Sequence, residues 1–354
     1  MDHPYASLPA GAFWSTGTAA AAPAALHGIF APQVAVTGET RITTAGSCFA
    51  QHIGRALARA GVAVQDAEPP PALPVALSEE RLRAWGYGLY SGRYGNIYTA
   101  RQMLQLLQEI AEGTPRTEAW SRGLRVFDAL RPNVEPEGLE TEAEMLALRE
   151  AHLLAVGRML LETDVFVFTL GLTEAWANRA TGLVYPTAPG VIAGAYDPAS
   201  HGFVNFRVAE VRADLEAILA LLRAFNPAMR MIVTVSPVSL SATASGGHVL
   251  TATTASKAVL RAAAGGFAAA HPGVVDYFPS FEIVTNPAAR GAFFAEGARE
   301  VRPEGVAAVM AVFLAAHGLV AGEAPAPRAV ARVEVEEDGD AVICEDLLLD
   351  AFRK

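Results

Sequence analysis

The sequence predicts a doubly wound α/β domain, in which helices cover both faces of a five-stranded parallel sheet. Strand-like and helix-like segments alternate along the chain, which is the order of a parallel sheet built from βα units. The segment 164–171 is a continuous apolar run, typical of a parallel strand that is buried on both faces. Hydrophobic residues make up 52% of the 354 residues, enough for a large core.

Each predicted strand is bounded by a glycine, a proline or the start of a helical pattern. The β-prone run before Gly46 is followed by apolar residues at helical spacing, and Gly61 ends that helix. Pro303 stands at a favourable first-turn position of the last helix. The predicted strands are 41–45, 62–64, 164–171, 231–237 and 274–278, and the predicted helices are 49–60, about 103–110, a long one from 142, about 208–224, about 255–269 and about 303–316.

These elements predict one domain with additions. Residues 1–40 are expected to form an N-terminal extension that packs on the domain, and 41–325 to form the α/β domain itself. A helical and loop insertion at about 67–140, rich in Gly, Arg and aromatic residues, is expected over the edge of the sheet. The remaining residues, 326–354, are expected to be a linker and a short tail.

Charge and composition exclude several classes of protein. A net charge of −10 argues against a nucleic-acid partner, which needs a basic face. No apolar stretch reaches the ~20 residues of a membrane span, and the first residues do not resemble a secretory signal, so a cytoplasmic location is expected. No His, Cys, Asp or Glu spacing indicates a metal site, and no cofactor is expected.

The segment Gly46-Ser47-Cys48-Phe49-Ala50, between a predicted strand and a predicted helix, is the candidate site of chemistry. The first backbone N–H groups of a helix favour negative charge, so this position stabilises a Cys48 thiolate and makes it the preferred nucleophile. Ser47 is the alternative nucleophile, although serine is also a common helix cap. A structural role for both residues, with Cys48 as a small buried apolar side chain, is the remaining alternative.

These five residues resemble the signature of the GSCFA domain family. The resemblance continues through 94–98, 169–176 and 235–237 and so covers most of the chain. The family is distantly similar to the SGNH, or GDSL-like, hydrolases, a group of esterases and acyltransferases that often act on acylated sugars or lipids. The resemblance therefore implies a flavodoxin-like fold and acyl-transfer chemistry.

The resemblance also implies roles for residues at the strand ends. Gly46, Ser47 and Cys48 match the Gly-Asp-Ser block, which places Cys48 at the nucleophile. The segment from Gly171 to Glu174 matches Gly-x-Asn-Asp, so Thr173 is the implied oxyanion donor. Gly95, followed by Asn96, is implied as a backbone donor, because the acyl oxygen gains charge in the transition state. Thr173, Gly95 and Asn96 are equally explained as turn formers.

The pattern breaks where the hydrolases have Asp-x-x-His before the last helix, because 299–303 reads Arg-Glu-Val-Arg-Pro. A general base must then come from elsewhere. His248 is preferred, because its Gly-rich loop follows a strand expected to neighbour the one ending at Gly171. His201 lies in another predicted loop. His52 lies four residues after Cys48 on the same helix, where contact with the thiol is possible.

Three further charged residues are candidates with weaker support. Glu174 and Glu282 are possible carboxylates to orient the imidazole, although surface solvation explains either one. Lys257 is a possible anion or substrate contact, although a lysine near a helix end is usually only solvated.

The sequence thus predicts a hydrolase or acyltransferase that uses a cysteine nucleophile, with a small-molecule, glycan or lipid acyl substrate. The alternative is a non-catalytic ligand-binding module that has lost the Asp-x-x-His pair and holds an anionic group with the turn amides and Arg302. A third hypothesis is redox sensing by Cys48, with Cys344 as the unreactive second cysteine.

Overall fold

Four parallel strands form the central layer of the computed structural model, which describes residues 3–22, 26, 28–72 and 77–319. The strands follow the order β1-β4-β8-β9, and every neighbouring pair is parallel. Their bounds are Ile42–Gly46 for β1, Val165–Leu170 for β4, Arg230–Val235 for β8 and Val275–Phe278 for β9. The alternation of strand and helix therefore predicted the α/β class and the parallel sheet correctly.

The predicted five-stranded sheet is wrong by one strand within the described residues. The predicted strand at 62–64 makes a single parallel bridge, between Val64 and Ile42, instead of a ladder. The chain leaves the edge soon afterwards, since the Gln65 N–H still donates to the Ile42 carbonyl but the Ala67 N–H donates to Ser91. The proline-rich stretch that begins at Pro69 has no N–H groups with which to continue a ladder.

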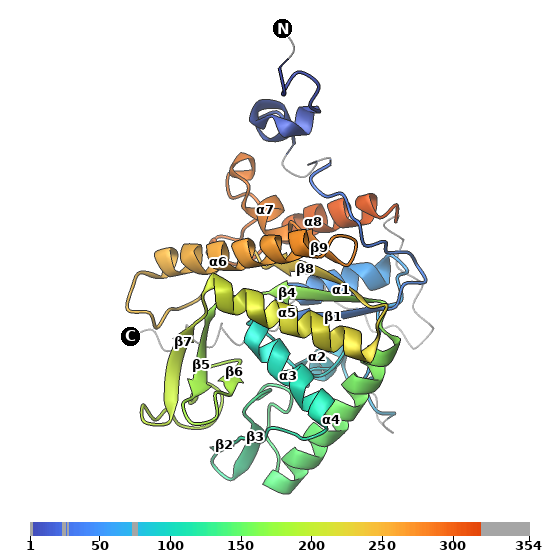
Figure 1. Cartoon of the computed structure of the whole chain (residues 1–354). Helices are drawn as coiled ribbons and strands as arrows, with labels where there is room; N and C mark the ends of the chain where they lie inside the picture. Colours follow the sequence, from blue (N-terminus) through green and yellow to red (C-terminus); the bar gives the residue numbers. More distant parts are fainter. Residues whose placement is uncertain (1–2, 23–25, 27, 73–76, 320–354) are drawn as a thin grey trace.

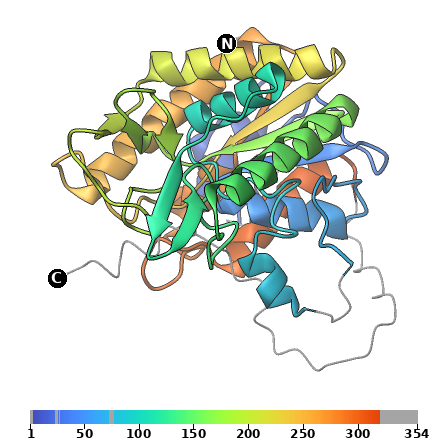
Figure 2. The same ribbon diagram turned by 90° about the horizontal axis from the view of Figure 1, so that it is seen from below.

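Helices cover both faces of the sheet, as the doubly wound class requires (Figure 1). Helices α3, α4, α5 and α6 contribute to the core on one face, and α1, α7 and α8 to the core on the other. Figure 2, a view from below, shows α3, α4 and α5 side by side over their face. The helices are α1 Phe49–Arg59, α2 Glu79–Ala84, α3 Ala100–Glu112, α4 Glu142–Glu162, α5 Val208–Phe225, α6 Val249–Ala270, α7 Ser280–Thr285 and α8 Pro303–Ala316, with short turns η1 Ala10–Ala12, η2 Ser15–Ala19 and η3 Pro287–Ala289.

Strand β4 shows how one sequence serves two cores. Phe166 and Phe168 are buried in the core with α3 to α6, whereas Val165 and Val167 are buried in the core with α1, α7 and α8. Successive side chains of a strand point to opposite faces, so a strand between two helical layers must be apolar at every position. This is the physical reason for the unbroken apolar run.

Two small antiparallel sheets lie outside the predicted elements. The pair β2 and β3 lies within the expected insertion, and the sheet with order β6-β5-β7 follows the end of β4. Figure 1 shows both sheets beyond the same end of the central layer. Their bounds are Ala119–Arg122 for β2, Arg125–Asp128 for β3, Glu174–Asn178 for β5, Val184–Tyr185 for β6 and His201–Asn205 for β7.

The structure describes most of the predicted N-terminal extension but not the predicted C-terminal tail. Leu26, Val34 and Val36 of the N-terminal segment are buried in the core with α1 and α8. The turns η1 and η2 bury no residue and project from the domain (Figure 1), so only the later part of the extension packs on it. The predicted tail at 326–354, including Cys344, lies outside the described residues. In the part of the chain that the structure describes, no helix is both long enough and apolar enough to cross a bilayer.

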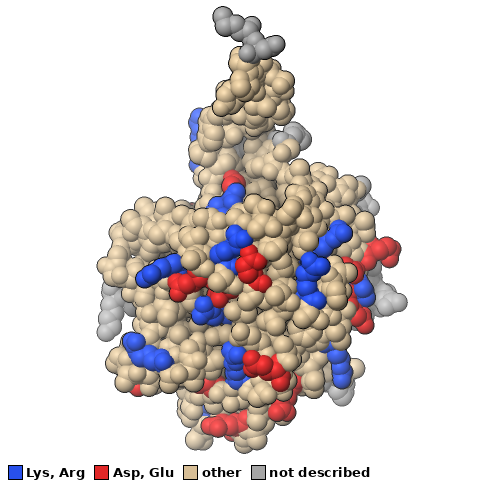
Figure 3. All heavy atoms as spheres, viewed as in Figure 1, with Lys and Arg blue, Asp and Glu red and all other residues tan. Residues whose placement is uncertain are grey.

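Lys and Arg side chains are interspersed with Asp and Glu on the face shown in Figure 3, and many lie next to a residue of the opposite sign. The negative net charge therefore does not gather into a single acidic patch on this face.

Candidate active site at the carboxyl end of the sheet

The candidate turn lies where β1 passes into α1. Gly46 has φ of +139°, and a Cβ at this position would overlap the backbone of Thr169 on β4. The Ser47 N–H then donates to the Thr169 carbonyl at 3.0 Å. Only glycine allows this close approach of two backbones, so Gly46 fixes the place at which Ser47 and Cys48 leave the sheet.

Two segments distant in sequence meet the turn. The Ile97 N–H donates to the Gly46 carbonyl at 2.9 Å, and the Tyr98 carbonyl accepts from the Gly171 N–H at 2.9 Å. A Cβ at Gly171 would lie 2.9 Å from the Ser47 Cβ, so these residues are in direct contact. We refer to Gly46–Cys48, Asn96–Tyr98, Gly171–Thr173 and Lys257 as the strand-end cluster.

Ser47 and Cys48 are both buried at the start of α1, with 2% and 5% of their surfaces exposed. Cys48 occupies the cap position of α1 in a helical backbone conformation, with φ −50° and ψ −31°. The residue therefore lies at the helix N-terminus, and stabilisation of its thiolate by the helix amides stays a prediction. The buried Ser47 hydroxyl has no hydrogen-bond partner among the described residues, so it does not act as the predicted cap.

Asn96 is tied to α1 by a buried polar chain. Tyr90 donates its hydroxyl to the Asn96 side-chain oxygen, and Gln51 of α1 donates to the Tyr90 hydroxyl oxygen at 3.1 Å. Gly95, just before, has φ of +68°, a conformation that favours glycine. The prediction that Gly95 and Asn96 lie near the turn is confirmed, and their role as donors to an oxyanion stays a prediction.

Thr173 and Lys257 are also near the turn, and both are engaged. The Thr173 hydroxyl donates to the side-chain oxygen of Asn205 on β7 at 2.7 Å, and its N–H donates to Ser256 at 2.9 Å. The Thr173 hydroxyl proton, which was expected to bind an oxyanion, is therefore already donated to Asn205. The Lys257 ammonium donates to the Gly171 carbonyl at 2.6 Å, and the residue is only 3% exposed. The alternative prediction, that Lys257 is only solvated, is therefore wrong.

The preferred base, His248, is placed differently from the expectation. It is exposed, it caps α6, and its Nδ1 accepts from the Leu250 N–H at 3.1 Å. It precedes Lys257 by nine residues, which is about 13.5 Å along a helix at 1.5 Å per residue. Helix α6 begins at Val249, six residues before the expected start, so His248 is held at a helix end instead of in a flexible loop.

The other predicted residues divide between the turn and remote positions. His52 is half-buried one turn after Cys48 on α1, with its ring 5.7 Å from that of Phe49. His201 lies on β7, not in a loop as expected, and its Nδ1 accepts from the Asp197 N–H at 3.1 Å. Both Glu174 oxygens accept from the Thr243 hydroxyl at 2.8 Å. Glu282 accepts from Arg261 and, at 2.8 Å, from Tyr277. The structure places only His52 of these residues on the helix of Cys48.

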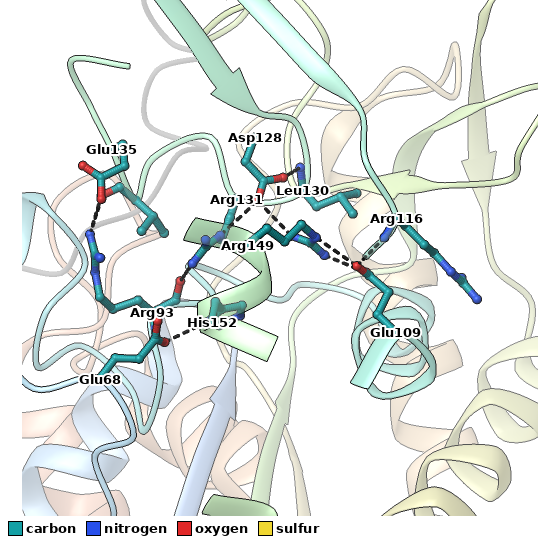
Figure 4. Close-up of polar contacts among 11 residues, drawn as sticks. Glu68, Arg93, Glu109, Arg116, Asp128, Leu130, Arg131, Glu135, Arg149 and His152 are labelled. Atoms are coloured by element: carbon teal, nitrogen blue, oxygen red, sulfur yellow. Dashed lines mark hydrogen bonds and ion pairs between the residues drawn. The ribbon is translucent and has the colours of Figure 1, made fainter. Parts of the chain in front are cut away.

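Sequence reasoning missed a buried network of arginines, carboxylates and one histidine, shown in Figure 4. Arg149 on α4 binds Glu109 on α3 through two hydrogen bonds of 2.6 and 2.9 Å, and it binds Asp128 at 2.9 Å. Arg131 binds Asp128 at 3.0 Å and donates to the Arg93 carbonyl at 3.2 Å. The residues come from four distant parts of the chain, so no local motif predicted the network.

The same network holds the segment that crosses the turn. Glu68 accepts from the Arg93 N–H at 2.6 Å and contacts Nδ1 of His152 at 2.7 Å. Arg93 itself donates to Glu135 at 2.7 Å. Arg93 lies three residues before Asn96, where the segment that hydrogen-bonds Gly46 and Gly171 begins, so the network anchors the chain close to one wall of the strand-end cluster.

His152 is neutral in this setting. Burial first, and then the charge of Arg131, lowers its pKa to about 4. Burial alone raises the pKa of the Glu68 carboxyl, but the hydrogen bond from His152 and the nearby positive charges bring it below its usual value. Nδ1 therefore carries the proton and donates to Glu68. The buried Nε2 has no partner within the described residues. His152 lines a cavity of about 30 Å³, room for about one or two waters.

The shift of His152 predicts a pH-dependent stability. Between pH 6.5 and about 4 the unfolded chain binds a proton that the folded chain does not, so the free energy of unfolding falls as pH falls. The loss attributable to His152 is on the order of 3 kcal/mol across this window. Urea denaturation at pH 7 and pH 5 should show about 2 kcal/mol of this loss, and His152→Asn, which keeps an N–H donor but does not titrate, should show a smaller loss. Equal losses in both proteins would contradict the assignment.

The fold and the turn define an α/β protein with a cysteine at the carboxyl end of its first strand. The chain belongs to the GSCFA family, whose family model matches residues 41–313. A comparison with curated proteins finds no match. Among the described residues, no group of three or more His, Cys, Asp or Glu side chains is placed to hold a metal ion.

Proposed function

We propose that this protein is a hydrolase or acyltransferase in which Cys48 carries the acyl group. The observation that supports this best is the position of Cys48 at the N-cap of α1, at the carboxyl end of the sheet. Ligands of open parallel sheets bind at this edge, and the helix N-terminus favours the thiolate over the thiol. We place this activity in the cytoplasm, as the sequence analysis expected.

The strand order supports the distant similarity to SGNH hydrolases that underlies the proposal. With the Val64 bridge counted as a rudimentary edge strand, the spatial order becomes 2-1-3-4-5, the flavodoxin-like order. In that arrangement the Cys48 turn and the segment after β4 lie at adjacent strand ends, the position at which a nucleophile and an oxyanion donor are needed.

We propose His52 as the general base in place of His248. Helical side chains lean toward the N-terminus, and residues four apart share a face, so His52 lies on the helix face of Cys48, with its ring against Phe49. His201 already accepts from Asp197, and His248 caps its own helix. With the half-buried His52 as base, the missing Asp-x-x-His segment does not remove general-base catalysis.

The proposed reaction has two steps. His52 takes the thiol proton as the Cys48 sulfur attacks the acyl carbonyl; the bond to the alcohol breaks, and the imidazolium returns the proton to the departing alkoxide. Water, or an acceptor alcohol, then gives its proton to His52 and attacks the thioester. The bond between the acyl carbon and the sulfur breaks, and the imidazolium returns the proton to the departing Cys48 thiolate. The helix amides and the Lys257 charge stabilise the oxyanion of each step.

A covalent adduct tests the proposal. Incubation with p-nitrophenyl acetate should raise the intact mass of the wild-type protein by one acetyl group, because deacylation of a thioester is a separate step. Cys48→Ala should show no adduct, while Cys344→Ala should be labelled like the wild type. Labelling of Cys48→Ala to the same extent as the wild type would refute the assignment.

The second candidate, a ligand-binding module without catalysis, is favoured by one observation. The segment before α8 lacks both Asp and His, and Arg302 stands at the cap of that helix. This candidate requires thermal stabilisation by an anionic ligand and no adduct or turnover with any ester. The labelling experiment therefore separates it from the enzyme.

A further inference from the structure

A groove of about 520 Å³ runs between α6 and α7. One wall is a stripe of α6 from Thr253 to Ala262, and Phe281 and Phe294 form part of the other wall. The volume lies in the range of about 300–1,000 Å³ that is usual for small-molecule sites. It exceeds the cavity beside His152, about 30 Å³, by more than tenfold.

The groove passes the strand-end cluster at Lys257, near the middle of the α6 stripe. Lys257 lines it and donates to the Gly171 carbonyl, and Gly171 touches Ser47. The neighbouring Ser256 accepts from the Thr173 N–H at 2.9 Å. A ligand in the groove whose reacting group lies at Lys257 is therefore next to the turn that carries Cys48.

The chemistry of the walls is apolar. No Asp, Glu, Asn or Gln is among the described residues that line the groove. The Thr254 and Thr285 hydroxyls donate to backbone carbonyls of their own helices, at 2.9 and 2.7 Å. Arg261 binds Glu282, and its guanidinium lies 4.0 Å from the centre of the Tyr277 ring.

A sugar ring presents hydroxyl groups that need carboxylate or amide partners, and these walls do not supply them. Methyl groups, alanines and phenyl rings instead match a hydrocarbon chain. From Lys257 to Ala262 the stripe advances five residues, about 7.5 Å. A six-carbon chain is about 6 Å at ~1.2 Å per extended bond, so this part of the groove accommodates it.

We infer that the groove binds the aliphatic acyl chain of the substrate, with the acyl carbonyl at Lys257 and the chain directed toward Ala262. The inference rests on the proposed function and adds to it the substrate class: the enzyme acts on esters of medium-length fatty acids in preference to acetate esters. The alcohol or sugar portion then lies outside this groove.

Chain-length profiles test the inference. The kcat/KM for p-nitrophenyl esters should rise from acetate to hexanoate in the wild-type protein, by up to about fourfold for each methylene buried, and should change little from hexanoate to decanoate. Ala258→Trp fills the groove from an exposed position of α6. It should lower the ratio of decanoate to acetate kcat/KM at least tenfold. Ala255→Trp, at an exposed position of the same helix that does not line the groove, should leave this ratio unchanged.

Two failures are distinguishable. Turnover with equal kcat/KM for acetate and decanoate esters overturns the groove inference and leaves the proposed function intact. Absence of both turnover and acyl adduct overturns the proposed function. Calorimetric titration with sodium decanoate then tests whether the groove binds a hydrocarbon chain. Binding to the wild type that is lost in Ala258→Trp supports a hydrocarbon site, and no binding to the wild type refutes it.

Discussion

Cys48→Ala is expected to lower kcat/KM for an activated ester by roughly 10³-fold or more, because removal of the atom that carries the acyl group leaves only binding and oxyanion stabilisation. Ser47→Ala is expected to cost far less, because the Ser47 hydroxyl has no partner in the described structure and its loss breaks no hydrogen bond. The measurement is initial-rate hydrolysis of p-nitrophenyl esters, after confirmation that each variant keeps the wild-type melting temperature.

The same pair of variants decides between the two nucleophiles. Both side chains are buried and adjacent, so packing losses should be similar and small, and the difference in kcat/KM reports the chemistry. Cys344→Ala is the control for general thiol effects. If Ser47→Ala removes activity while Cys48→Ala keeps it, the nucleophile is Ser47.

Arg149→Met is expected to lower the free energy of unfolding by about 3–5 kcal/mol, because it leaves two buried carboxylates without their shared partner. Glu109 and Asp128 are 1% and 8% exposed, and Arg149 is 3% exposed. Burial lowers the pKa of Arg149, but the charges and hydrogen bonds of Asp128 and Glu109 raise it by more, so it lies above the usual value. The guanidinium is therefore charged throughout. Urea denaturation at pH 7 measures the loss.

Arg158→Met is the matched control, since Arg158 is an exposed arginine on the same helix. Exposed substitutions of this kind change stability by about 0.5 kcal/mol or less. Arg149→Lys should recover part of the loss, because lysine keeps the charge but not the paired hydrogen bonds to Glu109. Equal stability of the Arg149→Met and Arg158→Met variants would show that the network contributes nothing to the fold.

The elements that the sequence predicted well are those with a strong local signal. Three examples are the apolar run of β4, the start of α8 at Pro303 and the strand-turn-helix around Gly46. In each of them the residues that cause the structure lie within the element itself. The edge strand at 62–64 was predicted on the same kind of signal and was wrong, because the length of an edge ladder depends on where the chain goes next. The sheet of β5, β6 and β7 was missed, since its pairing spans residues 174–205.

The sequence by itself determined the fold class, the family and the place of Cys48 at a helix start, because periodicity, glycine and a five-residue signature are local properties. Only the tertiary structure decided which groups meet that cysteine. In the structure Lys257 hydrogen-bonds Gly171, Thr173 hydrogen-bonds Asn205, and His248 caps α6. Glu68 contacts both Arg93 and His152, which come from distant segments. These contacts depend on how helices pack across the sheet, and sequence spacing carries no record of that packing.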